Sequence, residues 1–337
     1  MKTGKAVLVS VGIIAAVLAV AGGVGYFVYN KVESRSKQAA AQMKAEAERD
    51  DADRSAPQCG SHDDDERAKA VLAPIEPALQ NTQRPVARIE LETMKADDVA
   101  VSKVGGRAYW AAGRDYPRDP KGQPLFLLAQ IQLGELPKMP GYPERGMLQF
   151  FISGDDFYGA AIDAAHSPKR MDALAEPKGF RVVYWADASA PAIVPPAATA
   201  GLDALPFDPA KPRRIRFSAD HETMGIHDVG LAKVLGTDID ALAERYISAN
   251  VDDRVAAEDL SDEVSDYLDR SGHKLGGYPD FTQDDPRGAD DKRVLLFQLD
   301  SDDGLMWGDS GIANFFIDPA DLARADFSRV SYHWDCY

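Results

Sequence analysis

The chain has 337 residues, of which 45% are hydrophobic and 27% charged, a composition typical of a globular protein. Its 38 Lys and Arg residues against 54 Asp and Glu give a net charge of −16, which repels phosphate backbones and argues against nucleic acid as a partner. The same excess favours cationic partners, although a solvated acidic surface gives the same count. Two cysteines, Cys59 and Cys336, are too few for a disulfide framework, and their pairing is left open.

Residues 6–29 form an uninterrupted apolar run without a charged side chain. As a helix the run would be about 36 Å long, enough to cross a hydrocarbon core of about 30 Å. A cleaved signal peptide is the alternative, since Ala19-Val20-Ala21 has the small-x-small form, but the run exceeds the usual length of about 7–15 residues. We therefore expect a single-pass membrane anchor. The positive charges on its two flanks favour a cytoplasmic location for the domain that follows.

A polar linker is expected after this anchor. Residues 30–65 are rich in Ala, Lys, Glu and Gln and end in an acidic run, which suits a solvated helical stalk. Residues 66–80 then have the pattern of one amphipathic helix, interrupted by Pro74 and Pro77. We assign the folded domain to 66–337.

Three short motifs occur twice in this domain, at about 102–153 and 273–318. Each copy has a Lys-x-Gly-Gly turn, a Leu-Leu-x-Gln strand and a strand with a Phe-Phe-Ile core. The motifs are Lys103-Val104-Gly105-Gly106, Leu127-Leu128-Ala129-Gln130-Ile131 and Gln149-Phe150-Phe151-Ile152, then Lys274-Leu275-Gly276-Gly277, Leu295-Leu296-Phe297-Gln298-Leu299 and Asn314-Phe315-Phe316-Ile317. The offsets between copies are 171, 168 and 165 residues, so order is kept and spacing drifts evenly. We infer an internal duplication.

The rest of the domain supplies helices and one long loop. Residues 187–212 are loaded with Ala and Pro and are expected to run as an extended surface loop. A helix is expected from Thr237, as N-cap, to Ser248, and another over 258–270. The fold class is therefore α+β, with two mostly antiparallel sheet halves related by a pseudo-twofold axis, and with helices covering one face of the sheet.

Several sequence blocks resemble the YwqG-like family, a bacterial domain of unknown function. The blocks are Ser102–Gly106, Pro124–Ile131, His273–Pro279, Phe281–Arg287, Asp300–Asp302, Met306–Gly311 and Ala313–Ile317. The resemblance covers roughly residues 84–337 and implies a duplicated α+β fold and a bacterial source, but no reaction. Family members are usually soluble, so the anchor is an addition. Arg107-Ala108-Tyr109-Trp110 replaces the family's Pro-containing stretch, which puts a binding role for that loop in doubt.

Three motifs that look catalytic are better interpreted as loops. Gly308-Asp309-Ser310-Gly311 resembles a protease nucleophile turn but lacks its surroundings, so a tight turn is expected. His221 and His227 are six residues apart, whereas helical zinc ligands need a spacing of four. The acidic run from Asp300 to Asp303 lacks the acid at the twelfth position that a calcium loop requires, which leaves a looser metal site from Asp300, Asp302 and Asp309 as the alternative.

The C-terminal segment is aromatic to its last residue, which is unusual for a frayed tail. By strand alternation, Tyr332 or Trp334 should enter the core, leaving His333 and Asp335 on the opposite face. Together with the second Lys-x-Gly-Gly turn, these two side chains are the best candidates for a polar site. A satisfied structural hydrogen-bond network explains the same residues equally well.

Two hypotheses of function follow. The first is a membrane-tethered, non-catalytic module that binds another protein. The alternative is a small-ligand or metal-dependent enzyme or receptor, with a cleft between the repeat halves and its two lysines as anion-binding groups. The candidate ligand-binding residues are Lys103, Gln130, Lys274, Gln298, Asp300, Asp309, His333 and Asp335. The sequence assigns no catalytic residue, metal ligand or cofactor.

Overall fold

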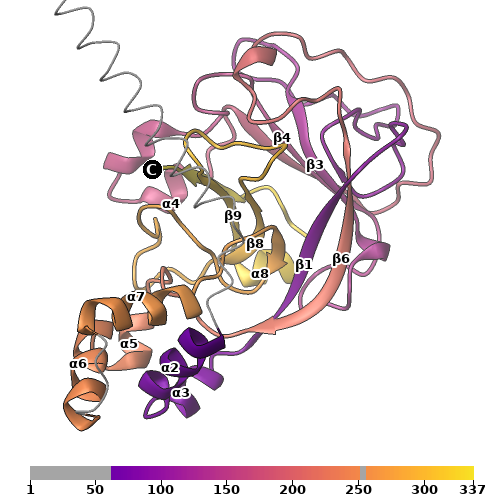
Figure 1. The fold of residues 1–337 in the computed structure, drawn as a ribbon. Coiled ribbons are helices and arrows are strands. Elements are labelled where there is room, and N and C mark those ends of the chain that lie inside the picture. Colours follow the sequence, from indigo (N-terminus) through magenta and orange to yellow (C-terminus); the bar gives the residue numbers. More distant parts are fainter. Residues whose placement is uncertain (1–61, 251–255) are drawn as a thin grey trace, which may run out of the picture. The chain divides into compact units, whose positions relative to one another are not determined.

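The computed structural model describes residues 62–250 and 256–337 (Figure 1). The predicted anchor at 6–29 and nearly all of the linker predicted at 30–65 lie outside these residues. Within the described ranges, no helix is long and apolar enough to span a bilayer. The described residues belong to one compact unit.

The elements of this unit follow one another along the chain in two runs of strands separated by helices. In order they are α2 (His62–Leu72), α3 (Glu76–Gln80), β1 (Arg84–Thr93), β2 (Lys103–Val104), β3 (Phe126–Gln132), η1 (Leu133–Glu135), β4 (Met147–Ile152), η2 (Ile162–His166), α4 (Arg170–Ala173), β5 (Phe180–Trp185), η3 (Leu202–Ala204), β6 (Arg213–Glu222), α5 (Leu231–Leu235), α6 (Ile239–Ala249), α7 (Ala257–Tyr267), β7 (Lys274–Gly276), β8 (Val294–Asp300), β9 (Ile312–Ile317), α8 (Pro319–Ala323) and β10 (Ser331–Asp335).

All ten described strands form one antiparallel sheet in the order β10-β9-β8-β7-β1-β6-β2-β3-β4-β5. The order is symmetric about the central pair β1–β6, so the first copy is β1–β5 and the second is β6–β10. Each copy's long first strand pairs with the second strand of the other copy, β1 with β7 and β6 with β2. A duplication implies this symmetry, which extends beyond the two segments in which the motifs repeat.

The equivalence of the copies extends to single residues. Lys103 lies opposite Gln130 in the first copy, and Lys274 lies opposite Gln298 in the second. A register shift interrupts β3 between Leu127 and Ala129, and β8 has its counterpart between Leu295 and Phe297. The predicted strands are therefore present in both copies, and each copy also carries an equivalent bulge that the sequence did not predict.

The sheet curls into a nearly closed barrel around an aromatic core. Phe150 of β4 lies 4.7 Å from Phe297 of β8, ring centroid to ring centroid, and Phe180 of β5 lies 5.3 Å from Tyr332 of β10. The segment after α4 lies at the remaining edge, because the backbone N–H of Tyr332 donates to the carbonyl of Leu174 at 3.1 Å. Tyr332 is fully buried in this core, as strand alternation predicted.

The helices form a layer of their own. Residues 94–102 connect β1 to β2, whereas the equivalent connection from β6 to β7 spans 223–273 and carries α5, α6 and α7. The apolar side chains of these helices pack on one another and on α2 and α3. The expectation that they cover a face of the sheet is wrong, because they have enough apolar surface to bury among themselves. We call α2, α3 and α5–α7 the helical layer.

Two helix boundaries differ from prediction. Asp238, not Thr237, is the N-cap of α6, because its carboxylate accepts the backbone N–H of Ala241 at 2.7 Å. The helix predicted over 258–270 ends at Tyr267. The single helix predicted at 66–80 is two helices: α2 begins at His62, within the predicted linker, and α3 begins at Glu76 with Pro77 in its first turn.

Candidate functional site

The two Lys-x-Gly-Gly lysines point inward and bind carboxylates of their own domain. Lys274 is fully buried, and its Nζ lies 3.0 Å from Oε1 of Glu222, which is itself 2% exposed. Lys103 is equally buried and pairs with Asp97. Burial lowers the pKa of Lys274 to about 8. Both ammonium groups are thus neutralised internally.

The Gly-Gly pair explains how these carboxylates reach the lysines. Gly106 and Gly277 have φ angles of +73° and +68°, in the left-handed region. A Cβ on Gly106 would lie 2.6 Å from Oδ1 of Asp97, and one on Gly277 would lie 2.1 Å from Oε1 of Glu222. The next backbone N–H after each pair donates to the same carboxylate, at 2.8 and 2.6 Å. The motif is therefore a turn that encloses a buried ion pair.

The two strand glutamines tie neighbouring loops together. Oε1 of Gln130 accepts the backbone N–H of Tyr109 at 3.0 Å, and Oε1 of Gln298 accepts that of Asp280 at 2.8 Å. Each Nε2 donates to two carbonyls of the loop before the Lys-x-Gly-Gly turn, at 2.8 to 3.0 Å. Since all these groups are backbone groups, both glutamines position loops in equivalent ways.

One strand further out, the copies diverge. In the first, Oε1 of Gln149 accepts the indole N–H of Trp185 at 2.8 Å. In the second, Oδ1 of Asn314 is buried and has no hydrogen-bond partner. Polar residues replace apolar or aromatic ones around Asn314: Asp280, Thr282, His333 and Asp335 stand where the first copy has Tyr109, Ala111, Val183 and Trp185. With His227, these residues and Asn314 form what we call the second-copy polar cluster.

His227 and Asp280 are the closest contact in this cluster. Nδ1 of His227 lies 2.5 Å from Oδ1 of Asp280, and the side chains are 41% and 6% exposed. The hydrogen bond to Asp280 raises the pKa of His227, while burial raises the pKa of Asp280 to about 6. The two shifts describe one coupled pair, which we expect to hold a single proton to higher pH than an isolated histidine does.

His333 and Asp335 lie on the same face of β10, as predicted from strand alternation. Asp335 accepts the backbone N–H groups of Thr282 and Gln283 at 3.3 and 3.0 Å. Nε2 of His333 is 3.9 Å from Oδ2 of Asp335, too far for a hydrogen bond, and is buried without a partner. Burial lowers the pKa of His333 to about 3, so its ring is neutral at physiological pH, and burial raises the pKa of Asp335.

The eight predicted residues do not form one site. Lys274, Gln298, His333 and Asp335 belong to the second copy, in the polar cluster or beside it, while Lys103 and Gln130 lie in the other half of the sheet. Asp300 accepts the backbone N–H of Gly272 at 2.6 Å. Asp309 is exposed in the tight turn expected there.

Four members of the cluster lie outside the predicted site residues: His227, Asp280, Thr282 and Asn314. His227 lies in a loop, as expected, and meets Asp280 only in the fold, because the two are 53 residues apart in the sequence. The signal that could have found Asp280 is its alignment with Tyr109 of the first copy. Among residues 62–250 and 256–337, no group of three or more His, Cys, Asp or Glu side chains is arranged to hold a metal ion.

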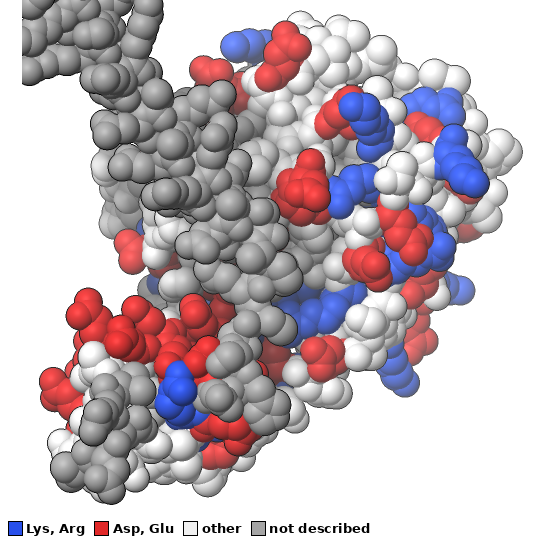
Figure 2. Space-filling view, in the orientation of Figure 1, with Lys and Arg blue, Asp and Glu red and all other residues white. Residues whose placement is uncertain are grey.

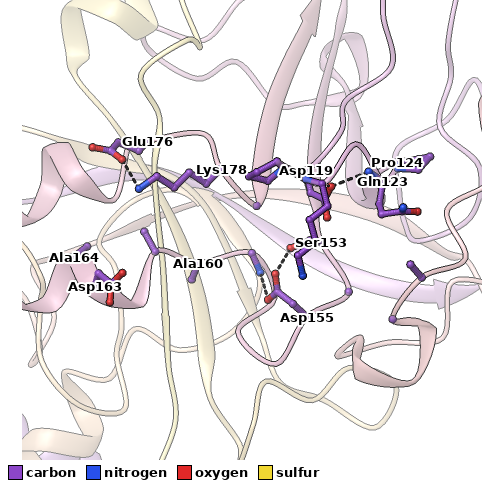
Figure 3. A pocket seen from close by; sticks show the side chains of 18 of the residues that line it. Asp119, Gln123, Pro124, Ser153, Asp155, Ala160, Asp163, Ala164, Glu176 and Lys178 are labelled. Carbon is purple, nitrogen blue, oxygen red and sulfur yellow. Dashed lines mark hydrogen bonds and ion pairs between the residues drawn. The ribbon is translucent and has the colours of Figure 1, made fainter.

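A separate hollow of about 570 Å³ opens in the first copy (Figure 3). Small residues, including Gly154, Gly159 and Ala160, make up much of its lining. Charged side chains lie among them: the ion pair between Glu176 and Lys178, with Nζ to Oε2 at 2.7 Å, is on one side of the view. Its volume suits a small ligand.

The space between the two halves is different from the predicted cleft. Inside the barrel the aromatic core fills it. Outside, a hollow of about 820 Å³ lies between the strand pair β1–β6 and residues 133–144, and neither Lys103 nor Lys274 lines it.

The sequence of this fold matches the family described as a domain of unknown function (DUF1963) over residues 102–336. The chain belongs to that family, which agrees with the predicted resemblance to a bacterial domain of unknown function. The match begins after β1, so the strand that pairs with both β6 and β7 precedes it. No curated protein matches the chain.

Proposed function

We propose that the protein is a membrane-tethered, non-catalytic binding module whose helical layer docks a protein partner with a basic surface. The observation that carries this proposal is the acidic exposed face of the helical layer. In Figure 2, acidic side chains gather over the region of α2 and α7, with few basic ones among them. The layer is also where the duplication is broken, since only the second copy carries this insertion.

The charge is concentrated in a short stretch of chain. Residues 223–270 contain 12 Asp and Glu and 4 Lys and Arg, a net charge of −8, which is half of the total of −16. On α7, the exposed carboxylates are Glu258, Asp259, Asp262 and Asp266. Such a surface attracts cationic partners over about a Debye length, near 8 Å at physiological ionic strength.

Like charges within the layer remain close together. Burial, followed by the nearby carboxylates of Asp269, Asp262 and Asp64, raises the pKa of Asp266. Bringing a basic surface against these groups would relieve their mutual repulsion, which favours binding as well as faster encounter.

The predicted anchor at 6–29 gives this binding a location. A module held at the membrane meets membrane-bound partners at a raised effective concentration, so modest intrinsic affinity suffices. Under this proposal the chain is a bacterial YwqG-like protein with an added membrane anchor, and its folded domain lies on the cytoplasmic side.

One observation favours a second candidate function. The hollow of Figure 3 has the volume and the mixed lining of a small-ligand site, so a receptor for a small molecule is the alternative. The charges in its lining do not favour it, because the ion pair between Glu176 and Lys178 is already neutralised.

The test compares three forms of the full-length protein, each expressed in the organism that naturally makes it. The cells are treated with a cross-linker, the proteins are extracted in detergent, and each form is recovered by affinity capture. One is the wild type. The second neutralises the face of α7, and the third neutralises four exposed carboxylates elsewhere as a charge-matched control. The α7 variant carries Glu258→Gln, Asp259→Asn, Asp262→Asn and Asp266→Asn, and the control carries Glu90→Gln, Asp115→Asn, Glu144→Gln and Asp156→Asn.

The proposal predicts a protein with a basic surface that is captured by the wild type and the control variant but lost from the α7 variant. Raising the salt concentration should weaken the capture, since exposed charges are screened. Identical captured proteins in all three samples would refute a docking role for the helical layer.

A further inference from the structure

The second-copy polar cluster, defined above, presents its carboxylates on a fixed scaffold. Both backbone groups of Asp280 are hydrogen-bonded. Oε1 of Gln298 accepts its N–H at 2.8 Å, and Nδ2 of Asn314 donates to its carbonyl at 2.7 Å. Asp335 is held by two backbone N–H groups. Both side chains are thus placed before any partner binds, which lowers the entropic cost of binding one.

Around His227 the acceptors outnumber the cations. Three carboxylates act electrostatically on its imidazole: Asp280 from the β7–β8 loop, Asp269 after α7, and Asp335 from β10. The nearby ammonium of Lys274 is committed to Glu222 and to the carbonyl of Arg270. On the far side of the cluster, Arg170 of α4 faces His333.

Buried polar atoms without partners lie beside these carboxylates. Oδ1 of Asn314 belongs to a side chain with no exposed surface and has no hydrogen-bond partner, and Nε2 of His333 is also unpartnered. Leaving one such group unpaired costs about 1–3 kcal/mol. The equivalent position in the first copy has no such cost, because Trp185 donates to Gln149. A donor-bearing ligand would satisfy the acceptor on Asn314.

We propose that the second-copy polar cluster binds a primary ammonium group, supplied by a lysine side chain of the basic partner. The inference rests on the proposed function for the source of the lysine. An ammonium group fits better than a guanidinium, because each carboxylate already uses oxygens internally: Asp335 accepts two backbone N–H groups, and Asp280 accepts from His227. The acceptor positions that remain free are therefore single ones on separate elements. They suit the three diverging N–H donors of an ammonium group better than the parallel N–H pair of a planar guanidinium.

The site has a defined pH dependence. Protonated His227 supplies a positive charge that competes with the ligand. Because Asp280 raises the pKa of His227, this competing charge is present at neutral pH and is lost as pH rises through the histidine's pKa. Affinity for the ammonium group therefore increases with pH in that range, until the amine itself deprotonates near pH 10.

The test uses full-length protein, labelled with ¹³C at the histidine ring carbons and held in detergent micelles. The probe is Nα-acetyl-lysine amide, whose side-chain ammonium group is free. The signal of His227 is assigned by its absence in His227→Gln. Putrescine and N-acetyl-arginine amide serve as the free-amine and guanidinium comparisons. Asp335→Asn removes a carboxylate of the cluster, and Asp309→Asn is the matched control, since Asp309 is exposed and outside the cluster.

We expect the lysine amide to shift the His227 signal saturably and to lower the pKa of His227, with arginine amide binding more weakly. Asp335→Asn should weaken lysine-amide affinity at least ~10-fold, or about 1.4 kcal/mol, while Asp309→Asn leaves it unchanged. No saturable shift of the His227 signal in the wild type would overturn the inference. The inference would also be overturned if the cluster bound putrescine more tightly than the lysine amide and the Asp335→Asn variant still captured the partner normally.

This outcome is separable from that of the proposed function. Failure of the lysine probe leaves the charge-dependent capture by α7 to stand or fall on its own comparison. If Asp335→Asn fails to fold, the pH dependence of lysine-amide binding in the wild type still decides, because the inference requires affinity to rise as His227 loses its proton.

Discussion

Glu222→Gln is the change that most directly tests the buried ion pair behind the Lys-x-Gly-Gly turn. Glutamine keeps the shape of the side chain and one oxygen acceptor, but removes the charge that holds Lys274. Lys274 has no exposed surface, so the uncompensated ammonium cannot turn to water. We expect it to release its proton instead, since a buried lysine without a counter-charge is neutral.

The size of the effect follows from the pKa. At about 8, the pKa of Lys274 favours its charged form at pH 7 by one unit, or about 1.4 kcal/mol, and releasing that proton costs the folded state this amount. Weakening the charge-assisted hydrogen bond from the backbone N–H of Tyr278, at 2.6 Å, adds about 1 kcal/mol. Loss of the partly exposed ion pair from Arg88 to Oε2, at 2.7 Å, adds up to about 1 kcal/mol, so the total is about 2–3 kcal/mol at pH 7.

The sign of the pH dependence is specific. Below pH 8 the wild-type native state holds the lysine proton and the variant does not, while both unfolded states hold it. The cost of Glu222→Gln therefore grows by about 1.4 kcal/mol for each pH unit below 8 and loses this component above pH 8.

Urea unfolding of the full-length protein, followed by tryptophan fluorescence at pH 6, 7 and 9, measures this cost. All four tryptophans, Trp110, Trp185, Trp307 and Trp334, lie in the sheet domain, so the signal reports its unfolding. Repeating the substitution in a Lys274→Met background is the control, because the pH-dependent part should vanish there. A cost that is independent of pH, or unchanged in that background, would refute the reasoning.

Three further predictions concern the turn, the dyad and the strand glutamine. Gly277→Ala should cost at least about 3 kcal/mol in the same urea assay, because its Cβ would lie 2.1 Å from a carboxylate oxygen of Glu222. Gly122→Ala is the control: its φ is +81° but nothing lies within 4 Å, so it should cost only about 1–2 kcal/mol, and equal costs for the two variants would contradict this. Asp280→Asn should lower the pKa of His227 in an NMR titration, since it replaces the anionic acceptor that raises it, and an unchanged pKa would show that the contact is not formed. Gln298→Leu should cost about 2–3 kcal/mol and speed amide exchange in the loop it holds, because the N–H of Asp280 and the carbonyl of Gly272 lose their partner and the carbonyl of Arg270 keeps only Lys274; unaltered exchange would count against its role.

The duplication was predictable because its motifs are local. Lys-x-Gly-Gly and Leu-Leu-x-Gln each act within a turn or a strand, so the same physical need leaves the same residues in both copies. The crossed pairing of β1 and β6 was not predictable in this way. Their register pairs Arg84 with Glu222, about half the domain's length away in the sequence, and neither strand contains one of the repeated motifs.

The candidate site was predicted in part for the same reason. Alternation along one strand was enough to place His333 and Asp335 on a common face. The dyad of His227 and Asp280 needs two loops to meet, which depends on the long connection between β6 and β7 and on Gln298 holding the second loop. The burial of the lysines was missed because their partners, Asp97 and Glu222, lie outside the repeated motifs.

Binding affinity as a function of salt concentration tests the central claim most directly. The partner recovered by capture is titrated against the full-length wild type, the α7 variant and the charge-matched control between about 50 and 300 mM salt, a range over which screening of exposed charges changes strongly. We predict that the wild type and the control bind with the same steep salt dependence, and that the α7 variant binds more weakly with a shallower one. Equal affinity and slope for all three would contradict docking on the acidic helical layer.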